Sequence, residues 1–314
     1  MSDYIVTDVI DGIGRITLNR PAAINALDES MMHTMTEALV QWRNDDDVTA
    51  VELSGNGDRG FCSGADVRAL SQALTSGGAW LHFLEHEYSL DMLIADYPKP
   101  VTSHLRGIAM GGGLGIGAHA DRRIVYADTV MAMPETKIGF FPDVGIMYQL
   151  SRAGAVGRHV TLTSATFTGG DALLMNLADE SADGPLPAPL FDSASAWIEE
   201  CYVSDQPADI IAALENHPDE NARKAAAEMR LRSPLSVHVA LRALNRAKTL
   251  NLGAIFDQDL RLAERLLPKG DFVEGVRALL IDKDNQPQWL YPSIEEVPLE
   301  VVDEIFAYRS SWKS

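Results

Sequence analysis

Three consecutive glycines, Gly111 to Gly113, separate a predicted strand at Val101–Leu105 from a predicted short helix at residues 112–120. Glycine has no side chain, so the backbone here can approach a ligand closely. The first turn of a helix also offers N–H groups and the positive end of the helix dipole. A strand that runs through glycines into a helix is typical of an α/β fold. The sequence predicts that this turn either faces a ligand or packs tightly against a neighbouring strand.

Predicted strands alternate with predicted helices over the first 150 residues, and predicted helices dominate from residue 144 onward. We expect Asp28 to be the N-cap of the first helix. A loop at residues 181–189 separates helical portions of the chain. The sequence therefore predicts an α/β core over residues 1–190 and a C-terminal helical region over residues 191–314. The expected strands are residues 4–9, 14–18, 49–53, 101–105 and 123–126, and the expected helices are residues 30–42, 65–74, 80–95, 112–120, 144–152, 170–176, 194–202, 222–232, 235–248, 255–267 and 271–280.

The charge of the chain narrows the classes of partner. The chain has 45 acidic and 26 basic residues and a formal net charge of −19, so nucleic acid and anionic membranes are not expected to bind it. No apolar run reaches transmembrane length, and the first residues do not resemble a secretory signal. With only two cysteines, no disulfide framework is expected. We therefore expect a cytoplasmic protein without a membrane anchor.

A second loop is a potential partner for the glycine run. Ser63-Gly64-Ala65-Asp66 follows the strand expected at residues 49–53 and precedes a predicted helix. If both loops end on one edge of the sheet, the N–H groups of Ala65 and Gly112 can face a single oxygen atom. Two such donors form an oxyanion hole, and the loss of one donor costs about 3–4 kcal/mol of transition-state stabilisation. Tight packing between helix and strand is the competing explanation for the glycines.

Two motif matches point to other chemistries. Residues 113–118 fit the dinucleotide pattern G-x-G-x-x-[GA], but the strand ends too early and no acidic residue follows at the expected distance. His82 to His86 fit the zinc pattern H-x-x-E-H without a third ligand. Cys62 lies close to Ala65, and we expect it to be a small buried side chain rather than a nucleophile. The sequence predicts no metal site.

Two carboxylates follow the glycine run, and each comes directly after a proline. Glu135 follows Pro134 and Asp143 follows Pro142, with a mostly apolar stretch between them. A carboxylate in apolar surroundings becomes a better base, because burial disfavours its charged form. The alternative is that both acids are exposed or cap helices, as most acids in an acidic chain do.

These residues together resemble the crotonase, or enoyl-CoA hydratase/isomerase, superfamily. The resemblance implies a ββα-spiral core that binds acyl-CoA, with the thioester oxygen between the N–H groups of Ala65 and Gly112. It also implies that CoA lies near Arg20, Asn25, Ala26, Leu27, Gly64 and Asp66, and that homo-oligomers such as trimers or hexamers form. The segments that carry the resemblance are Asn19-Arg20-Pro21, Asn25-Ala26-Leu27, Phe61-Cys62-Ser63-Gly64-Ala65-Asp66, Pro98-Lys99-Pro100, Gly107 and Gly111-Gly112-Gly113.

Two further segments resemble the 3-hydroxyisobutyryl-CoA hydrolase branch of that superfamily. In that branch, the counterparts of Glu87, Gly112, Glu135 and Asp143 line the acyl site. Gly145 is followed here by Ile146-Met147, where the branch usually has more glycine, so the acyl group is left open. The segments are Met133-Pro134-Glu135-Thr136 with Ile138-Gly139 and Phe141-Pro142-Asp143-Val144-Gly145, and Asp271-Phe272-Val273-Glu274-Gly275-Val276-Arg277-Ala278 with Ile281-Asp282-Lys283-Asp284.

Hydratases of the superfamily carry one glutamate two positions after the triple glycine and another twenty residues beyond it. Here the first position is Gly115 and the second is Glu135. One carboxylate and an oxyanion hole suffice for thioester cleavage, whereas hydration is helped by two acids. The resemblance therefore implies a hydrolase in which Glu135 attacks the carbonyl or activates water and Asp143 positions the water or the substrate hydroxyl.

Glu87 is expected to shape the acyl pocket of this hydrolase. The first-choice substrate is 3-hydroxyisobutyryl-CoA, an intermediate of valine catabolism. No cofactor is expected besides the CoA of the substrate. Two alternatives stay open: a hydratase or isomerase that works with Glu135 alone, and a non-catalytic protein that binds acyl-CoA or takes part in an assembly.

Overall fold

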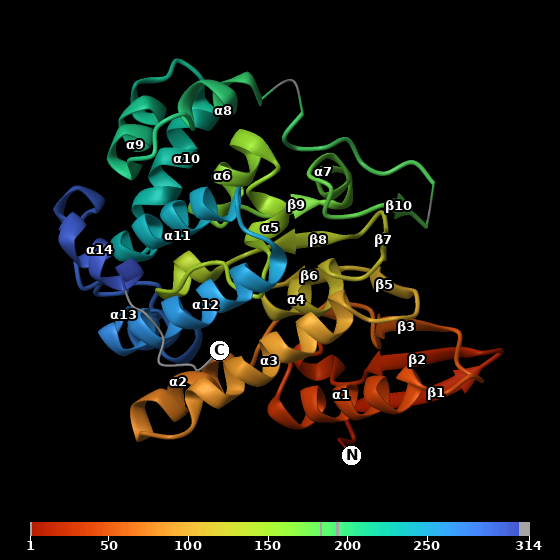
Figure 1. Cartoon of the computed structure of the whole chain (residues 1–314). Coiled ribbons are helices and arrows are strands. Elements are labelled where there is room, and N and C mark those ends of the chain that lie inside the picture. The colour runs from red at the N-terminus through yellow and green to blue at the C-terminus, as the bar shows by residue number, and fades with distance from the viewer. Residues whose placement is uncertain (1, 183, 193–194, 308–314) are drawn as a thin grey trace. The chain divides into compact units, whose positions relative to one another are not determined.

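The computed structural model describes residues 2–182, 184–192 and 195–307. The chain forms two compact units, and each is assembled from separate stretches of sequence (Figure 1). Unit 1 comprises Met1–Asp66, His82–Ala132 and Thr166–Asp192, and unit 2 comprises Val67–Leu81, Met133–Ala165 and Ser193–Ser314. This partition differs in kind from the two regions expected from the sequence, which meet at a single boundary near residue 190. That boundary stays a prediction.

Unit 1 is built on two sheets. The larger sheet has the strand order β1-β2-β3-β5-β7-β10, and the smaller sheet has the order β4-β6-β8-β9. All pairs are parallel except β1 with β2 and β8 with β9. The strands are β1 (Ile5–Ile10), β2 (Ile13–Leu18), β3 (Ala50–Gly55), β4 (Gly60–Cys62), β5 (Val101–Leu105), β6 (Ile108–Met110), β7 (Arg122–Val125), β8 (Val130–Ala132), β9 (Phe167–Thr168) and β10 (Glu180–Ser181).

Local sequence explains the first hairpin and the helix that covers it. Asp11 and Gly12 both have positive φ, as a tight two-residue turn between antiparallel strands requires. Asp28 caps helix α1 (Glu29–Arg43) by accepting the N–H of Met31, which confirms the expected N-cap. The helix packs along β1 and β2 (Figure 1). Unit 1 also contains η1 (Pro21–Ala23), α4 (Gly112–Ala118), α7 (Gly169–Leu174) and all but the first two residues of α3 (Trp80–Ala95).

Every element described in unit 2 is helical, in agreement with the helical pattern of the sequence. Helix α11 lies at its centre, since eleven of its residues are buried. The remaining elements are α2 (Val67–Ser76), η2 (Glu135–Ile138), α5 (Met147–Leu150), α6 (Gly154–Thr163), α8 (Ala196–Cys201), α9 (Pro207–Asn216), α10 (Glu220–Arg230), α11 (Pro234–Ala247), α12 (Leu252–Leu266), η4 (Leu267–Lys269), α13 (Asp271–Val276), the π-turn η5 (Arg277–Ile281), η6 (Ile294–Glu296) and α14 (Leu299–Ala307).

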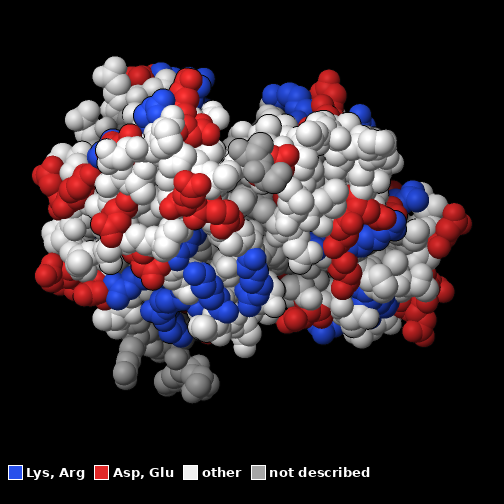
Figure 2. Space-filling model, turned by 90° about the horizontal axis from the view of Figure 1, so that it is seen from above, with Lys and Arg blue, Asp and Glu red and all other residues white. Residues whose placement is uncertain are grey.

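Charged side chains are spread over the face drawn in Figure 2, where Lys and Arg groups lie among Asp and Glu groups. This arrangement agrees with an acidic chain whose charge is mostly solvated. A search of the described helices for a long apolar segment finds none that would reach across a membrane.

Candidate active site

Unit 1 brings the two predicted amide donors close to each other. Helix α4 begins directly after Gly111, whose φ of 50° places it in the left-handed region. A Cβ atom built on Gly112 would lie 3.2 Å from the Ala65 nitrogen and 2.1 Å from Glu87 Oε1. Gly64, which has a φ of 105°, is also close to the start of α4. A Cβ atom built on Gly64 would lie 3.3 Å from the Gly112 nitrogen. A side chain at residue 112 would therefore crowd the Ala65 amide and collide with the Glu87 carboxylate.

The strand-like pairing around Ala65 directs its N–H group. The Leu27 N–H donates to the Gly64 carbonyl at 2.8 Å, and the Asp66 N–H donates to the Leu27 carbonyl at 2.9 Å. The carbonyl of Gly64 and the N–H of Asp66 thus both point toward Leu27. Since N–H groups alternate in direction along an extended chain, the Ala65 N–H points to the opposite side. This local pairing favours the predicted role of Ala65 as a donor.

Glu87 lies on α3 and is buried, and one helical turn later the same face carries Asp91, which is fully buried. Burial raises the pKa of the Cys62 thiol to about 12, and the charges of Glu87 and Asp91 add to the effect. The Cys62 thiol is therefore neutral and donates to the Asn25 carbonyl at 3.2 Å. This confirms that Cys62 is a small buried side chain. Sequence reasoning missed Asp91, although its spacing of four from Glu87 was a visible signal.

The residues predicted to lie near CoA form one cluster in unit 1. Arg20 binds the Asp66 carboxylate and the Ala26 carbonyl with distances of 3.3 and 3.1 Å. The Asn25 side chain is fully buried and donates to the carbonyls of Asn56, Gly60 and Phe61 at 3.0–3.1 Å. Leu27 is fully buried as well. The structure therefore groups these residues, and their contact with CoA stays a prediction.

Unit 2 contains the two predicted carboxylates, and both are buried. Glu135 is the first residue of η2 and has 7% of its surface exposed, while Asp143 has 6% exposed. This burial contradicts the alternative that both are surface acids. Asp143 begins a turn that the Ile146 N–H closes by donating to the Asp143 carbonyl at 3.1 Å. Helix α5 begins only at Met147 instead of residue 144, because Val144 and Gly145 have positive φ.

A third buried acid of unit 2 was not predicted. Asp259 lies on α12, is fully buried, and accepts the Gly145 N–H at 3.0 Å through Oδ2. Burial first, and then the charge of Asp143, raise the pKa of Asp259 well above its ordinary value. Asp259 occupies the apolar stripe of α12 with Ile255 and Leu262, and an acid at such a position was the available signal.

The residues of the zinc pattern at His82 to His86 are not arranged as a metal site in the described structure. Within residues 2–182, 184–192 and 195–307, no three His, Cys, Asp or Glu side chains are placed to hold a metal ion. His82 is exposed, and its ring nitrogens lie 3.8 Å from the Glu29 carboxylate and 3.6 Å from the Glu85 carboxylate. This arrangement is that of a solvated helix face.

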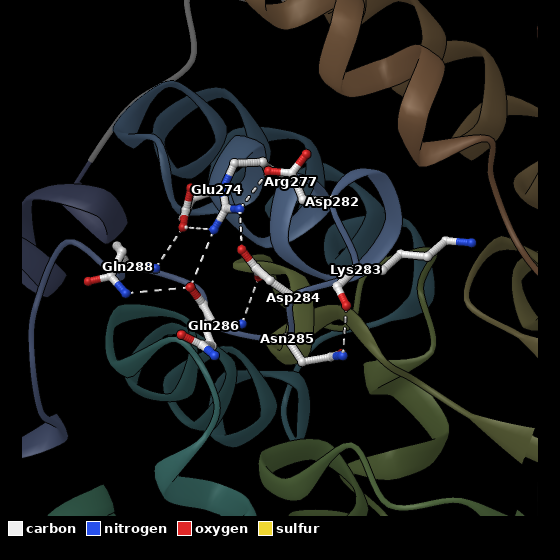
Figure 3. A network of polar contacts seen from close by, with 8 residues as sticks. All are labelled: Glu274, Arg277, Asp282, Lys283, Asp284, Asn285, Gln286 and Gln288. Carbon is white, nitrogen blue, oxygen red and sulfur yellow. Dashed lines mark hydrogen bonds and ion pairs between the residues drawn. The ribbon is translucent and has the colours of Figure 1, made fainter.

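The C-terminal segment that carries the resemblance to the hydrolase branch forms a polar network around Arg277 (Figure 3). The Arg277 guanidinium donates to Glu274, Asp282 and Asp284 at 2.7–2.9 Å and to the Gln286 carbonyl at 3.3 Å. Lys283 and Asn285 within the loop have positive φ, at 57° and 55°. The network holds a strained loop in place, and the Lys283 side chain points away from it (Figure 3).

Comparison with known proteins identifies relatives over nearly the whole chain. A model of the enoyl-CoA hydratase/isomerase family matches residues 13–184 and 180–306. The mitochondrial 3-hydroxyisobutyryl-CoA hydrolase of Gallus gallus is 32% identical over 332 residues, which cover 94% of this chain and 86% of that protein. The small ribosomal subunit protein mS47 of Neurospora crassa is 33% identical over 341 residues, with 90% and 67% covered.

A solved structure agrees with the sequence comparisons. The crystal structure of a carnitinyl-CoA dehydratase from Mycobacterium thermoresistibile is 40% identical, has a TM-score of 0.94, and matches over 99% of this chain and 98% of that chain. This likeness confirms the expected fold, a crotonase-like ββα core with additional C-terminal helices. The chain therefore belongs to the enoyl-CoA hydratase/isomerase, or crotonase, family.

Proposed function

We propose that this protein hydrolyses the CoA thioester of a short branched 3-hydroxy acid, with 3-hydroxyisobutyryl-CoA as the first candidate. The products are 3-hydroxyisobutyrate and CoA, which places the reaction in valine catabolism. The family membership and the name of the Gallus gallus relative support this proposal. The observation that carries it is the close approach of the Ala65 and Gly112 amides, at a glycine where an added Cβ would lie 3.2 Å from the Ala65 nitrogen.

The amides polarise the thioester carbonyl in this mechanism. As the carbonyl carbon becomes tetrahedral, its oxygen gains negative charge, and two fixed N–H donors stabilise that charge more strongly than mobile water does. No side chain at residue 112 obstructs the oxygen. The start of α4 contributes the positive end of a short helix to the same place.

Covalent geometry supports a role for Glu135 at this carbonyl. The Ala132 carbonyl accepts the Gly111 N–H at 3.2 Å, which fixes the end of β8 beside the start of α4. Glu135 comes three residues later, so its Cα lies within about 11 Å of that of Ala132. A glutamate side chain adds several ångströms of reach. The buried carboxylate of Glu135 thus follows, three residues later in sequence, a strand end that is bonded to the start of α4.

Glu135 then cleaves the thioester, either by attacking the carbonyl carbon or by taking a proton from a water molecule that attacks it. In both cases the C–S bond breaks and the sulfur leaves as a thiolate, which needs little acid assistance because a thiol is already weakly acidic. If Glu135 attacks, a water molecule then hydrolyses the resulting anhydride, which releases the 3-hydroxy acid and restores the Glu135 carboxylate. Asp143 orients the water or the substrate hydroxyl, and Glu87 shapes the acyl pocket. Hydroxylamine separates the two routes, because it traps a glutamyl anhydride only if Glu135 attacks.

A panel of short acyl-CoA esters tests the proposal. We expect thiol release to be fastest with 3-hydroxyisobutyryl-CoA and hydration of crotonyl-CoA to be negligible. The physical reason is Gly115, a buried glycine of α4 at the position where the first of the two hydratase glutamates would stand. Rapid hydration of crotonyl-CoA without thiol release would contradict hydrolysis.

A second candidate function is a hydratase or dehydratase that uses Glu135 alone. The 40% identity to a protein described as a carnitinyl-CoA dehydratase favours it. The same panel decides, because a dehydratase forms a conjugated C=C bond that absorbs in the ultraviolet and leaves the thioester intact. The non-catalytic alternative, favoured by the likeness to a ribosomal protein, predicts binding of these esters without any chemical change.

A further inference from the structure

A fully buried carboxyl group in unit 2 has no role in the mechanism proposed above. Asp259 projects from the apolar stripe of α12 and has 0% of its surface exposed. Its Oδ2 accepts the Gly145 N–H at 3.0 Å, and its Oδ1 has no hydrogen-bond partner among the described residues. A leucine here would continue the stripe without the cost of burying a polar group. The carboxyl group of Asp259 is therefore buried at a cost in stability that a leucine would avoid.

The segment that Asp259 holds is strained. Asp143 to Ile146 form a turn whose two central residues, Val144 and Gly145, have φ values of 52° and 72°. This pattern is that of a type I′ turn, which favours glycine and asparagine. A β-branched valine at positive φ is a true outlier, and such strain persists only where the surroundings enforce it. The bond from Gly145 to Asp259 is one contact that enforces it.

The Asp143 carboxyl is also buried, and it lies close enough for its charge to act on Asp259. Two carboxylates close together in an apolar environment do not both ionise, and one of them retains a proton. Burial and the charge of Asp143 raise the pKa of Asp259, and the Gly145 N–H only partly opposes the change. Asp259 is the more deeply buried of the two and has a single donor, which makes it the acid that keeps the proton.

Other charged groups lie on the elements that pack against α12. Helix α5 contributes Tyr148, η4 contributes Lys269, and α14 contributes Glu300, Asp303 and Glu304. Tyr148 stacks under Arg152, and Asp303 pairs with Arg242. Asp143 is the charged group whose field acts on Asp259.

We propose that Asp259 is the positioning residue of Asp143: a neutral carboxyl group that fixes the Val144-Gly145 turn and leaves the single negative charge of the pair on Asp143. The inference rests on the proposed function, in which Asp143 orients water or the substrate hydroxyl. A second negative charge on Asp259 would repel Asp143 and displace it from that role. The proton on Asp259 is therefore part of the active state.

Three variants test this assignment. Asp259→Asn is neutral and its amide oxygen can still accept the Gly145 N–H, whereas Asp259→Ala removes that acceptor. Asp257→Asn makes the same change two residues away at an exposed position of α12 and is the control. We expect kcat for thiol release to stay within about 3-fold of wild type in Asp259→Asn and to fall at least about 10-fold in Asp259→Ala, with Asp257→Asn unchanged.

The dependence of kcat on pH distinguishes a positioning role of Asp259 from a role in packing alone. The wild type should lose kcat at alkaline pH as Asp259 ionises, and Asp259→Asn should lack this loss while Asp257→Asn retains it. An Asp259→Asn enzyme with the wild-type alkaline loss, or with a kcat as low as that of Asp259→Ala, would overturn the proposal.

Two measurements without substrate keep the proposal testable if the protein is not a thioesterase. Carboxyl ¹³C NMR at pH 7 should show a protonated aspartic acid signal in the wild type and in Asp257→Asn that is missing from the spectrum of Asp259→Asn. The pKa of Asp259 is higher in the folded state, so the wild type should lose stability relative to Asp259→Asn as pH rises from about 4. Absence of the protonated signal overturns the assignment whatever the activity.

Discussion

Gly112 has a hydrogen atom where every other amino acid has a Cβ atom, and a Cβ atom at this position would obstruct the proposed site of the carbonyl oxygen. We predict that Gly112→Ala lowers kcat/KM for thiol release by a factor on the order of 10²–10³, which is the loss expected when an oxyanion donor no longer functions. The added Cβ would lie 3.2 Å from the Ala65 nitrogen and 2.1 Å from Glu87 Oε1, so it would displace Glu87 and crowd the Ala65 amide.

Gly253→Ala is a matched control for that substitution. Its Cβ would meet no atom closer than 3.8 Å, and it lies in the first turn of α12. We expect its kcat/KM to equal that of the wild type and its stability to be equal or slightly higher. Wild-type kcat/KM in Gly112→Ala, measured on folded protein, would contradict the placement of the carbonyl oxygen.

Single residues were predictable from sequence where a local rule applied. Ala65 and Gly112 both follow strands, and the ends of parallel strands meet along one sheet edge, so their approach was expected. Val144 could not be predicted at positive φ, because its sequence preference is the opposite. The enforcing contact is the bond from its neighbour Gly145 to Asp259, 114 positions after Gly145. The burial of Glu135 and Asp143 likewise depends on distant helices.

At the scale of elements, the packing of α6 against α8 creates a site of acid sensitivity. His159 on α6 is buried, and its Nδ1 lies 2.8 Å from the Tyr202 hydroxyl oxygen. Its ring meets the Trp197 ring edge-on at a centroid distance of 5.3 Å. Burial lowers the pKa of His159 to about 3, so the ring stays neutral in the folded protein.

We predict that this histidine destabilises the fold in acid. Because the pKa is lower in the folded state, the unfolded chain binds the extra proton, and stability falls as pH drops from about 6.5 towards 3, by up to about 1.4 kcal/mol per pH unit. Urea unfolding across this range measures the effect. His159→Phe combined with Tyr202→Phe removes the titrating ring without orphaning the hydroxyl, and its curve should be flatter than that of the wild type.

The exposed His33 provides the control for the acid experiment. His33→Gln should reproduce the wild-type dependence of stability on pH. If the double variant does so too, the buried neutral state of His159 is wrong.

Elements with strong periodicity or clear caps were predictable, and short or strained ones were not. The β1–β2 hairpin follows from Asp11-Gly12, and α1 follows from the Asp28 cap. Strands β6 and β8 have three residues each, too few to show the alternation that would predict a strand. The helix expected at residues 271–280 becomes a π-turn at Arg277, where the carboxylates of Glu274, Asp282 and Asp284 gather around the guanidinium.

At the scale of the whole molecule, the chain crosses from one compact unit to the other at positions that are next to the candidate site residues in sequence. One crossing follows Asp66, next to Ala65, and another follows Ala132, three residues before Glu135. Composition and periodicity predicted an α/β part and a helical part. The interleaved partition depends on contacts between segments far apart in sequence, which no local pattern encodes.

The central claim is that Glu135 is the carboxylate that cleaves a CoA thioester, and the most direct test is thiol release by Glu135→Gln. The amide keeps the shape of the side chain but is neither a base nor a nucleophile. Glu220→Gln, at an exposed position of α10, is the matched control. We predict that Glu135→Gln lowers kcat on 3-hydroxyisobutyryl-CoA by at least about 10³-fold while the Kd for the ester changes little. Thiol release by Glu135→Gln at the rate of the wild type and of Glu220→Gln would contradict the account.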